Sequence, residues 1–197
     1  MNFINYALIL QILILINPLS SFPVLVSAYE NKMKVKKIAL VAVLVAFILA
    51  LIIVLIGPYL FEVFKITIDS FRIAGGIVLL LLGLDRIRSS QEKKKFTKAD
   101  SIVSIIATPL LTGPAVISFL MVKTYEIGRM NILFDIFLAF VLVAIIFFIF
   151  SIALTRINIK VINISSKILG LFLTAIAIEM IAKGLNNLLL IKQVGVL

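Results

Sequence analysis

The chain of 197 residues has no cysteine, no histidine and no tryptophan, and only nine acidic side chains against nineteen basic ones. Without cysteine it can form neither a disulfide framework nor a reactive thiolate. Without histidine it lacks the usual proton shuttle and the commonest protein ligand of transition metals. No close pair of carboxylates is evident either, so the sequence argues against an enzyme. We therefore expect no catalytic residue, no metal site and no cofactor.

What the chain has in abundance is apolar surface. Hydrophobic residues make up 63% of it and charged residues only 14%, and uncharged runs of membrane-spanning length cover residues 38–61, 101–122 and 136–156, the last ending at an arginine. This composition predicts an all-α integral membrane protein with the lipid bilayer as its partner. The net charge of +10 could suggest that the protein binds nucleic acid. However, the basic residues lie in short segments between apolar runs, so we expect no nucleic-acid partner.

The hydropathy pattern predicts six transmembrane elements, at about residues 3–29, 36–57, 70–87, 100–123, 131–154 and 162–190. We interpret the chain as a single transmembrane domain over 1–197, with one repeat at about 1–92 and a second at about 98–197. Basic residues fill the first, third and fifth connections, which places these connections in the cytoplasm and both termini outside. The expected location is the plasma membrane, and the pattern indicates no particular oligomeric state.

Four of the five prolines belong to two copies of one motif, Asn-Pro-Leu-Ser-Ser-Phe-Pro at residues 17–23 and Thr-Pro-Leu-Leu-Thr-Gly-Pro at residues 108–114. The match extends beyond the prolines at one constant offset, which pairs Ser21 with Thr112 and Ser27 with Ser118. An internal duplication explains this. In the third span of each half, Gly76 precedes Asp85 by the same interval that separates Gly170 from Glu179.

An odd number of spans per repeat inverts the second copy relative to the first. Inverted repeats whose first helices are broken are a recurring plan of secondary transporters, in which the breaks build a substrate site near the midplane. Each break follows from proline, which lacks an N–H group and pushes the residue before it away from helical angles. The freed backbone groups persist in a membrane only beside protein or a water-lined cavity. A simple kink is the alternative interpretation.

The exposed ends of the half-helices offer N–H donors and carbonyl acceptors, which suit a small zwitterion. No charged residue lies within either motif. The candidate substrate-binding residues are Asn17, Pro18, Ser20, Ser21, Pro23, Thr108, Pro109, Thr112, Gly113 and Pro114. The hydroxyls of Ser27 and Ser118 fit helix-to-helix contacts at least as well.

Glu179 and Asp85 are the candidate coupling residues, because an ionisable group inside a membrane span is a functional candidate by default. Their places near span ends favour an interfacial or structural role, and Glu179 could pair with Lys183 one turn later. Either Na⁺ or H⁺ could be the coupling ion, and the sparse acids favour Na⁺ or uncoupled exchange. Arg72 fits a snorkelling anchor at the interface, while Glu126 and Asp135 look like ordinary span-end residues.

Three segments in order, 17–23, Phe-Arg-Ile-Ala-Gly-Gly-Ile at 71–77, and 108–114, resemble the MarC family of multi-pass membrane proteins. That family includes SnatA-type neutral amino-acid transporters, so the resemblance implies uptake or exchange of small neutral amino acids such as glycine and alanine. Ser20 and Ala115 stand where the family often has glycine, and their extra bulk bears on substrate size. A channel or facilitator for small polar solutes, or an efflux protein, is the alternative function.

Overall fold

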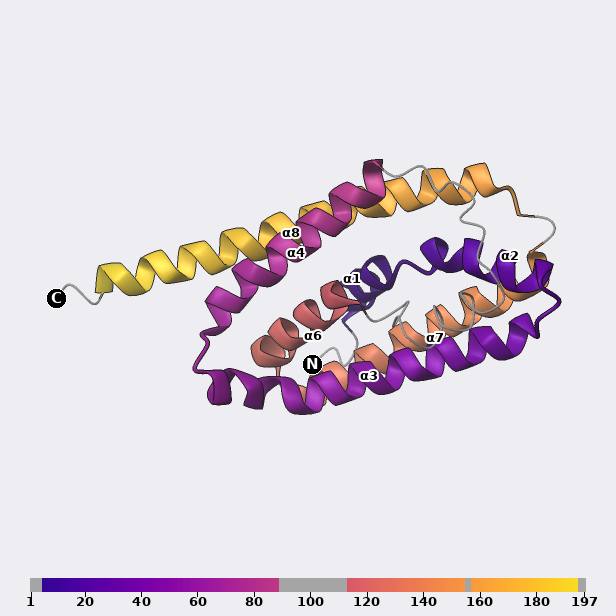
Figure 1. Ribbon diagram of the computed structural model, residues 1–197. Helices are drawn as coiled ribbons and strands as arrows, with labels where there is room; N and C mark the ends of the chain where they lie inside the picture. The colour runs from indigo at the N-terminus through magenta and orange to yellow at the C-terminus, as the bar shows by residue number, and fades with distance from the viewer. Residues whose placement is uncertain (1–4, 89–112, 155–156, 195–197) are drawn as a thin grey trace.

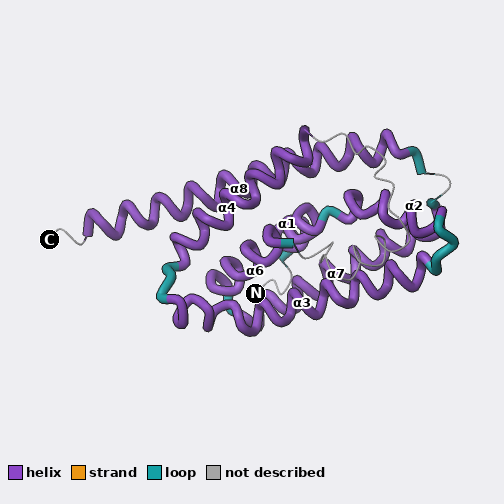
Figure 2. The backbone as a smooth tube through the Cα atoms, in the orientation of Figure 1, coloured by secondary structure: helices purple, strands orange, loops and turns teal. Residues whose placement is uncertain are grey.

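The computed structural model describes residues 5–88, 113–154 and 157–194, and in these ranges the ordered elements are all helices (Figures 1 and 2). In chain order they are α1 (Tyr6–Ile16), the short 3₁₀ helix η1 (Pro18–Ser21), α2 (Phe22–Glu30), α3 (Val35–Phe64), α4 (Ile68–Arg88), α6 (Pro114–Ile127), α7 (Arg129–Ala153) and α8 (Ile159–Val194). The predicted all-α class is confirmed.

Four helical stretches of the described chain are long and apolar enough to cross a membrane: Tyr6–Glu30, Val35–Phe64, Arg129–Ala153 and Lys160–Leu190. Helix α4 does not qualify because Asp69, Arg72 and Asp85 leave only residues 73–84 uncharged. The 14 residues of α6 are too few, and residues 100–112 of the predicted fourth element lie outside the described ranges. The described ranges therefore contain four candidate spans, and the count of six stays a prediction.

The helices form three layers (Figure 1). Helices α4 and α8 run antiparallel and pack along their length in one outer layer, while α3 and α7 do the same in the other. Helices α1 and α6 and the short η1 lie between these two pairs and contact both, and α2 continues from η1 along α3 and α7. In agreement, the most apolar stretch of Tyr6–Glu30 is 56% buried, against 28% for that of Val35–Phe64. The broken first helix is thus the centre of the molecule.

Glycines set the close approach of α4 and α8. A Cβ atom added at Gly83 would lie 3.0 Å from the backbone nitrogen of Thr174 and 3.1 Å from the carbonyl oxygen of Gly170. One added at Gly76 would lie 3.0 Å from the carbonyl oxygen of Ala177. Small residues at such seams let two backbones approach in a membrane, where van der Waals packing drives helix association.

Aromatic side chains fill the interface between α3 and α7. The ring of Phe47 lies 5.4 Å from that of Phe140 and 6.3 Å from that of Phe137. On the outward side of the same pair, Ile48 and Phe148 are 53% and 57% exposed. Because large apolar side chains on a soluble surface would be unfavourable, this outward side is the one that faces lipid.

The two ends of the helix stack differ in charge. The end that contains the connections at 31–34 and 157–158, here called the basic end, carries mostly lysine and arginine. Its described basic residues are Lys32, Lys34, Lys36, Lys37, Arg86, Arg88, Lys160 and Lys167. The opposite end, with the connections at 65–67 and at Gly128, carries acidic and basic residues together and is here called the network end.

Candidate functional site

The first helix is interrupted where the sequence predicts. Helix α1 ends at Ile16, and Asn17 adopts a left-handed conformation with φ 43° and ψ 70°, its N–H group donating to the carbonyl oxygen of Leu13 at 3.0 Å. Asparagine is one of the few residues that tolerate this conformation. After η1 the chain resumes helix at Phe22, with Pro23 in the first turn of α2. The predicted break in the first helix is therefore confirmed.

Three polar side chains are buried at the break. Asn17 and Ser21 are completely buried and Ser166 of α8 is 4% exposed. The Nδ2 group of Asn17 donates to the Oγ atom of Ser166 at 3.3 Å. Among the described residues, Asn17 Oδ1 and Ser21 Oγ have no hydrogen-bond partner. A buried polar atom without a partner costs about 1–3 kcal/mol of stability. A bound solute could remove this cost by donating a hydrogen bond to Asn17 Oδ1, and by donating to or accepting from Ser21 Oγ.

Ser20 has a different role from Ser21. Its Oγ group donates to the carbonyl oxygen of Asn17 at 2.8 Å, and its backbone N–H donates to the same oxygen at 3.0 Å. It therefore satisfies a carbonyl group that the break frees. Pro18 is buried and opens η1, so it shapes the turn and offers no polar group of its side chain.

Of the second motif, the structure describes only Gly113 and Pro114. Gly113 has extended backbone angles, φ −75° and ψ 178°, and Pro114 is the first residue of α6. This is the predicted place of the proline, at the start of a resuming helix. Thr108, Pro109 and Thr112 lie outside the described residues, so the meeting of the two breaks stays a prediction.

Helix α8 supplies polar groups to the break that the sequence analysis missed. Besides Ser166, Asn163 has a buried Oδ1 atom without a partner among the described residues. The two residues are three apart and therefore share a face of α8, and α8 contacts η1 directly. The signal was the polar segment Asn-Ile-Ser-Ser at 163–166, near the start of the predicted sixth transmembrane element.

The two candidate coupling residues lie apart from each other and outside the break. Asp85 is exposed near the basic end. Glu179 has a side chain that is 57% exposed, and it pairs with Lys183 at 2.7 Å as expected. Because Gly83 packs against Gly170 and Thr174, Glu179 lies further toward the network end than Asp85. The structure does not bring them together into one relay.

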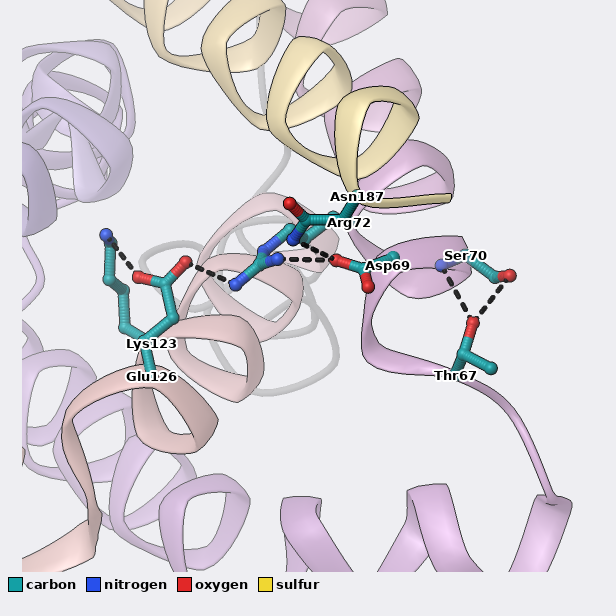
Figure 3. A network of polar contacts seen from close by, with 7 residues as sticks. All are labelled: Thr67, Asp69, Ser70, Arg72, Lys123, Glu126 and Asn187. Carbon is teal, nitrogen blue, oxygen red and sulfur yellow. Dashed lines mark hydrogen bonds and ion pairs between the residues drawn. The ribbon is translucent and has the colours of Figure 1, made fainter. Parts of the chain in front are cut away.

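Arg72 is not a snorkelling anchor, so that interpretation was wrong. The residue is only 8% exposed. Its Nη1 group contacts Asp69 Oδ1 at 2.5 Å and its Nη2 group contacts Glu126 Oε1 at 2.7 Å, which links α4 to α6. Lys123 Nζ contacts the other oxygen of Glu126 at 2.7 Å, and Asn187 of α8 donates to Asp69 Oδ1 at 3.0 Å (Figure 3). We call these five residues the Arg72 network.

Glu126 and Asp135 also have more specific environments than their places near helix ends indicated. Glu126 is a member of the Arg72 network. Asp135 is 3% exposed, and its Oδ1 atom accepts a hydrogen bond from the backbone N–H of Asn5 at 3.0 Å. Hydropathy places such residues at the ends of spans but does not show which of them face another helix. In the described ranges, no group of three or more acidic side chains could hold a metal ion.

Comparison with known proteins gives one consistent result. Residues 1–189 match the family described as MarC family integral membrane protein. A UPF0056 membrane protein of Methanocaldococcus jannaschii is 35% identical over 190 residues, covering 89% of this chain and 93% of that protein. The UPF0056 membrane protein YhcE of Escherichia coli is 33% identical over 189 residues, covering 88% of each chain.

A further UPF0056 membrane protein, from Aquifex aeolicus, is 32% identical over 200 residues and covers 91% of each chain. No solved structure matches. The relatives' names state membrane location and no substrate. Since the family match spans nearly the whole sequence, the chain belongs to the MarC family of integral membrane proteins.

Proposed function

We propose that this protein is a secondary transporter of small neutral amino acids such as glycine and alanine, with its substrate site at the break in the first helix. The observation that carries the proposal is the buried, unpartnered pair Asn17 Oδ1 and Ser21 Oγ. They lie in a central helix that is interrupted inside a membrane-spanning stretch. Interrupted helices of this kind form the substrate sites of secondary transporters.

The chemistry of the break supports a zwitterionic substrate. Residues 17–21 contain no charged side chain, so the break has no fixed charge that favours a net anion or cation. It offers one amide and one hydroxyl oxygen from Asn17 and Ser21. The carbonyl end of α1 suits an ammonium group, and the amino end of the following helical segment suits a carboxylate.

We further propose that the chain consists of two inverted repeats of three elements each. The antiparallel pairs α3 with α7 and α4 with α8 support this arrangement, because each pairs corresponding elements of the two halves. In this proposal α6, which starts at Pro114, corresponds to α2. Thr108, Pro109 and Thr112 would complete the substrate site from the opposite direction.

The charge separation supports an orientation in the plasma membrane. Positively charged connections stay in the cytoplasm, so the basic end faces the cytoplasm and the network end faces outward. Both termini then lie outside, since the N-terminal start of α1 and the C-terminal end of α8 lie toward the network end.

Transport by purified protein in proteoliposomes tests the function. Labelled glycine and alanine are supplied with Na⁺ and proton gradients imposed separately, and unlabelled leucine, lysine and glutamate serve as competitors. We expect saturable uptake that is inhibited by small neutral amino acids and not by lysine or glutamate. Solute-driven vesicle swelling much faster than saturable uptake would instead indicate a channel. No uptake of either amino acid by folded protein would overturn the proposal.

A further inference from the structure

A second polar site lies between the break and the network end. It is a pocket between α1, α4, α6 and α8, and its polar lining residues are Gln11, Arg72, Lys123, Glu126, Glu179 and Lys183. Gln11 lies on α1, six residues before the break at Asn17, a distance of about 9 Å along the helix axis. The pocket is therefore adjacent to the proposed substrate site, on the side that faces outward in the proposed orientation.

The charged lining of the pocket comes in close pairs of opposite sign. Glu126 bridges Arg72 and Lys123 at 2.7 Å each, and Lys183 lies 2.7 Å from Glu179. A zwitterion presents both charges and can exchange with such pairs without leaving a net charge behind. A singly charged solute would leave one lining group unpaired in a partly apolar pocket, which is unfavourable.

Arg72 has the geometry to hold a carboxylate. Its guanidinium presents a planar fork that matches carboxylate oxygens. The Nε donor of the residue is buried and has no partner among the described residues, while Glu126 occupies Nη2. Glu126 also contacts Lys123, so it keeps an ionic partner if an incoming carboxylate replaces it at Arg72.

We propose that this pocket binds the carboxylate of an amino acid at Arg72, in competition with the carboxylate of Glu126. The identity of the amino acid rests on the proposed function, whereas carboxylate binding does not. Replacement of Glu126 by the ligand removes the ion pair between α4 and α6. Binding in the pocket would then loosen the contact of these two helices at the network end, while their packing at Gly75 and Ser118 stays in place.

The absence of native cysteine permits a direct test of occupancy. A single cysteine introduced as Gln11→Cys in the pocket is reacted with a water-soluble maleimide in purified, detergent-solubilised full-length protein. The matched control is Met130→Cys, a residue that is 85% exposed at the network end and outside the pocket. Glycine should slow the labelling of Gln11→Cys and leave that of Met130→Cys unchanged. Acetate, which has the carboxylate alone, should do the same only at higher concentration, while methylammonium should slow neither.

Two further substitutions, each combined with Gln11→Cys, separate ligand binding from a structural role. Arg72→Gln should raise the half-protecting concentration of glycine at least about tenfold, because hydrogen bonds to charged groups contribute about 1.5–3 kcal/mol. Glu126→Gln should lower that concentration, because it removes the competing carboxylate. A purely structural ion pair predicts the opposite for Glu126→Gln, namely weaker protection, and this variant keeps the test decisive if Arg72→Gln does not fold.

The outcomes also separate this proposal from the transport proposal. Protection that depends on Arg72 without glycine uptake in proteoliposomes would support the pocket and overturn the transporter. Glycine uptake without protection of Gln11→Cys, or with protection unaffected by both substitutions, would overturn the pocket alone. Failure of Gln11→Cys to react while Met130→Cys reacts normally would show that water does not reach the pocket, and would overturn it as well.

Discussion

The seam between α4 and α8 gives a stability prediction that can be worked from distances. A Cβ atom added at Gly184 would lie 2.8 Å from the backbone carbonyl oxygen of Asp69 and 2.8 Å from Ile73 Cγ1. Ordinary contact begins at 3.4 Å. A backbone atom cannot rotate away, so the two helices must move apart by about 0.6 Å, the difference between 3.4 and 2.8 Å. A gap of this size costs the atoms around it about a quarter to a half of their dispersion energy.

Gly184→Val should therefore destabilise the protein by about 1–3 kcal/mol, the usual cost of overpacking. A loss of 1 kcal/mol lowers the melting temperature of a chain of this size by about 2–4 °C, so a shift of roughly 4–8 °C is expected at the middle of the range. The matched control is Ala182→Val. Residue 182 is exposed on the same helix, and its substitution should cost only about 0.5 kcal/mol in helix propensity.

The assay is the fraction of purified protein that stays monodisperse on gel filtration after heating, measured in one detergent for both variants. The added Cβ atom also lies 3.2 Å from Arg72 Cβ, so the substitution disturbs the Arg72 network as well as the seam. If Gly184→Val melts within a degree or two of Ala182→Val, the close packing of α4 on α8 is not as described, and the reasoning fails.

Three further predictions concern the break and the candidate coupling residue. Asn17→Gly keeps a residue that accepts the left-handed angles but removes the amide, so it should abolish glycine uptake by protein that still folds; normal uptake would exclude Asn17 from the site. Ser166→Ala leaves Asn17 Nδ2 buried without its partner, and we expect a stability loss of about 1–3 kcal/mol, measured by the same heating assay; an unchanged melting temperature would contradict the contact. Glu179→Gln should retain accumulation under an imposed proton gradient, because Glu179 is half exposed and paired with Lys183; complete loss in folded protein would identify it as a proton carrier.

Hydropathy and proline spacing predicted much of this fold, and for physical reasons. The apolar runs are long enough to set helix existence almost alone, so α3, α7 and α8 lie where the sequence indicates. The break at Asn17 was predictable because proline acts on its own backbone and on the residue before it. The end of α3 was not, since the helix continues through Pro58 to Phe64 although the predicted span ends at residue 57.

The Arg72 network and the contribution of α8 to the break could not be predicted in the same way. Both depend on which face of a helix meets which neighbour, and a single sequence carries little information on that pairing in a membrane. Arg72 and Glu126 lie 54 residues apart, and each alone looks like a residue at the end of a span. Asn17 and Ser166 lie 149 residues apart, and neither has a local partner that would indicate the contact.

The length of α8 has a consequence for the membrane in which the protein works. Its 36 residues extend over about 54 Å, whereas the hydrocarbon core of a bilayer is about 30 Å thick and the whole bilayer about 40–45 Å. Helix α8 must therefore tilt or project beyond the headgroups. Because α8 packs along α4 and also contacts the break through Ser166, a change of its tilt is transmitted to both neighbours. Uptake should accordingly vary with the acyl-chain length of the lipid used for reconstitution.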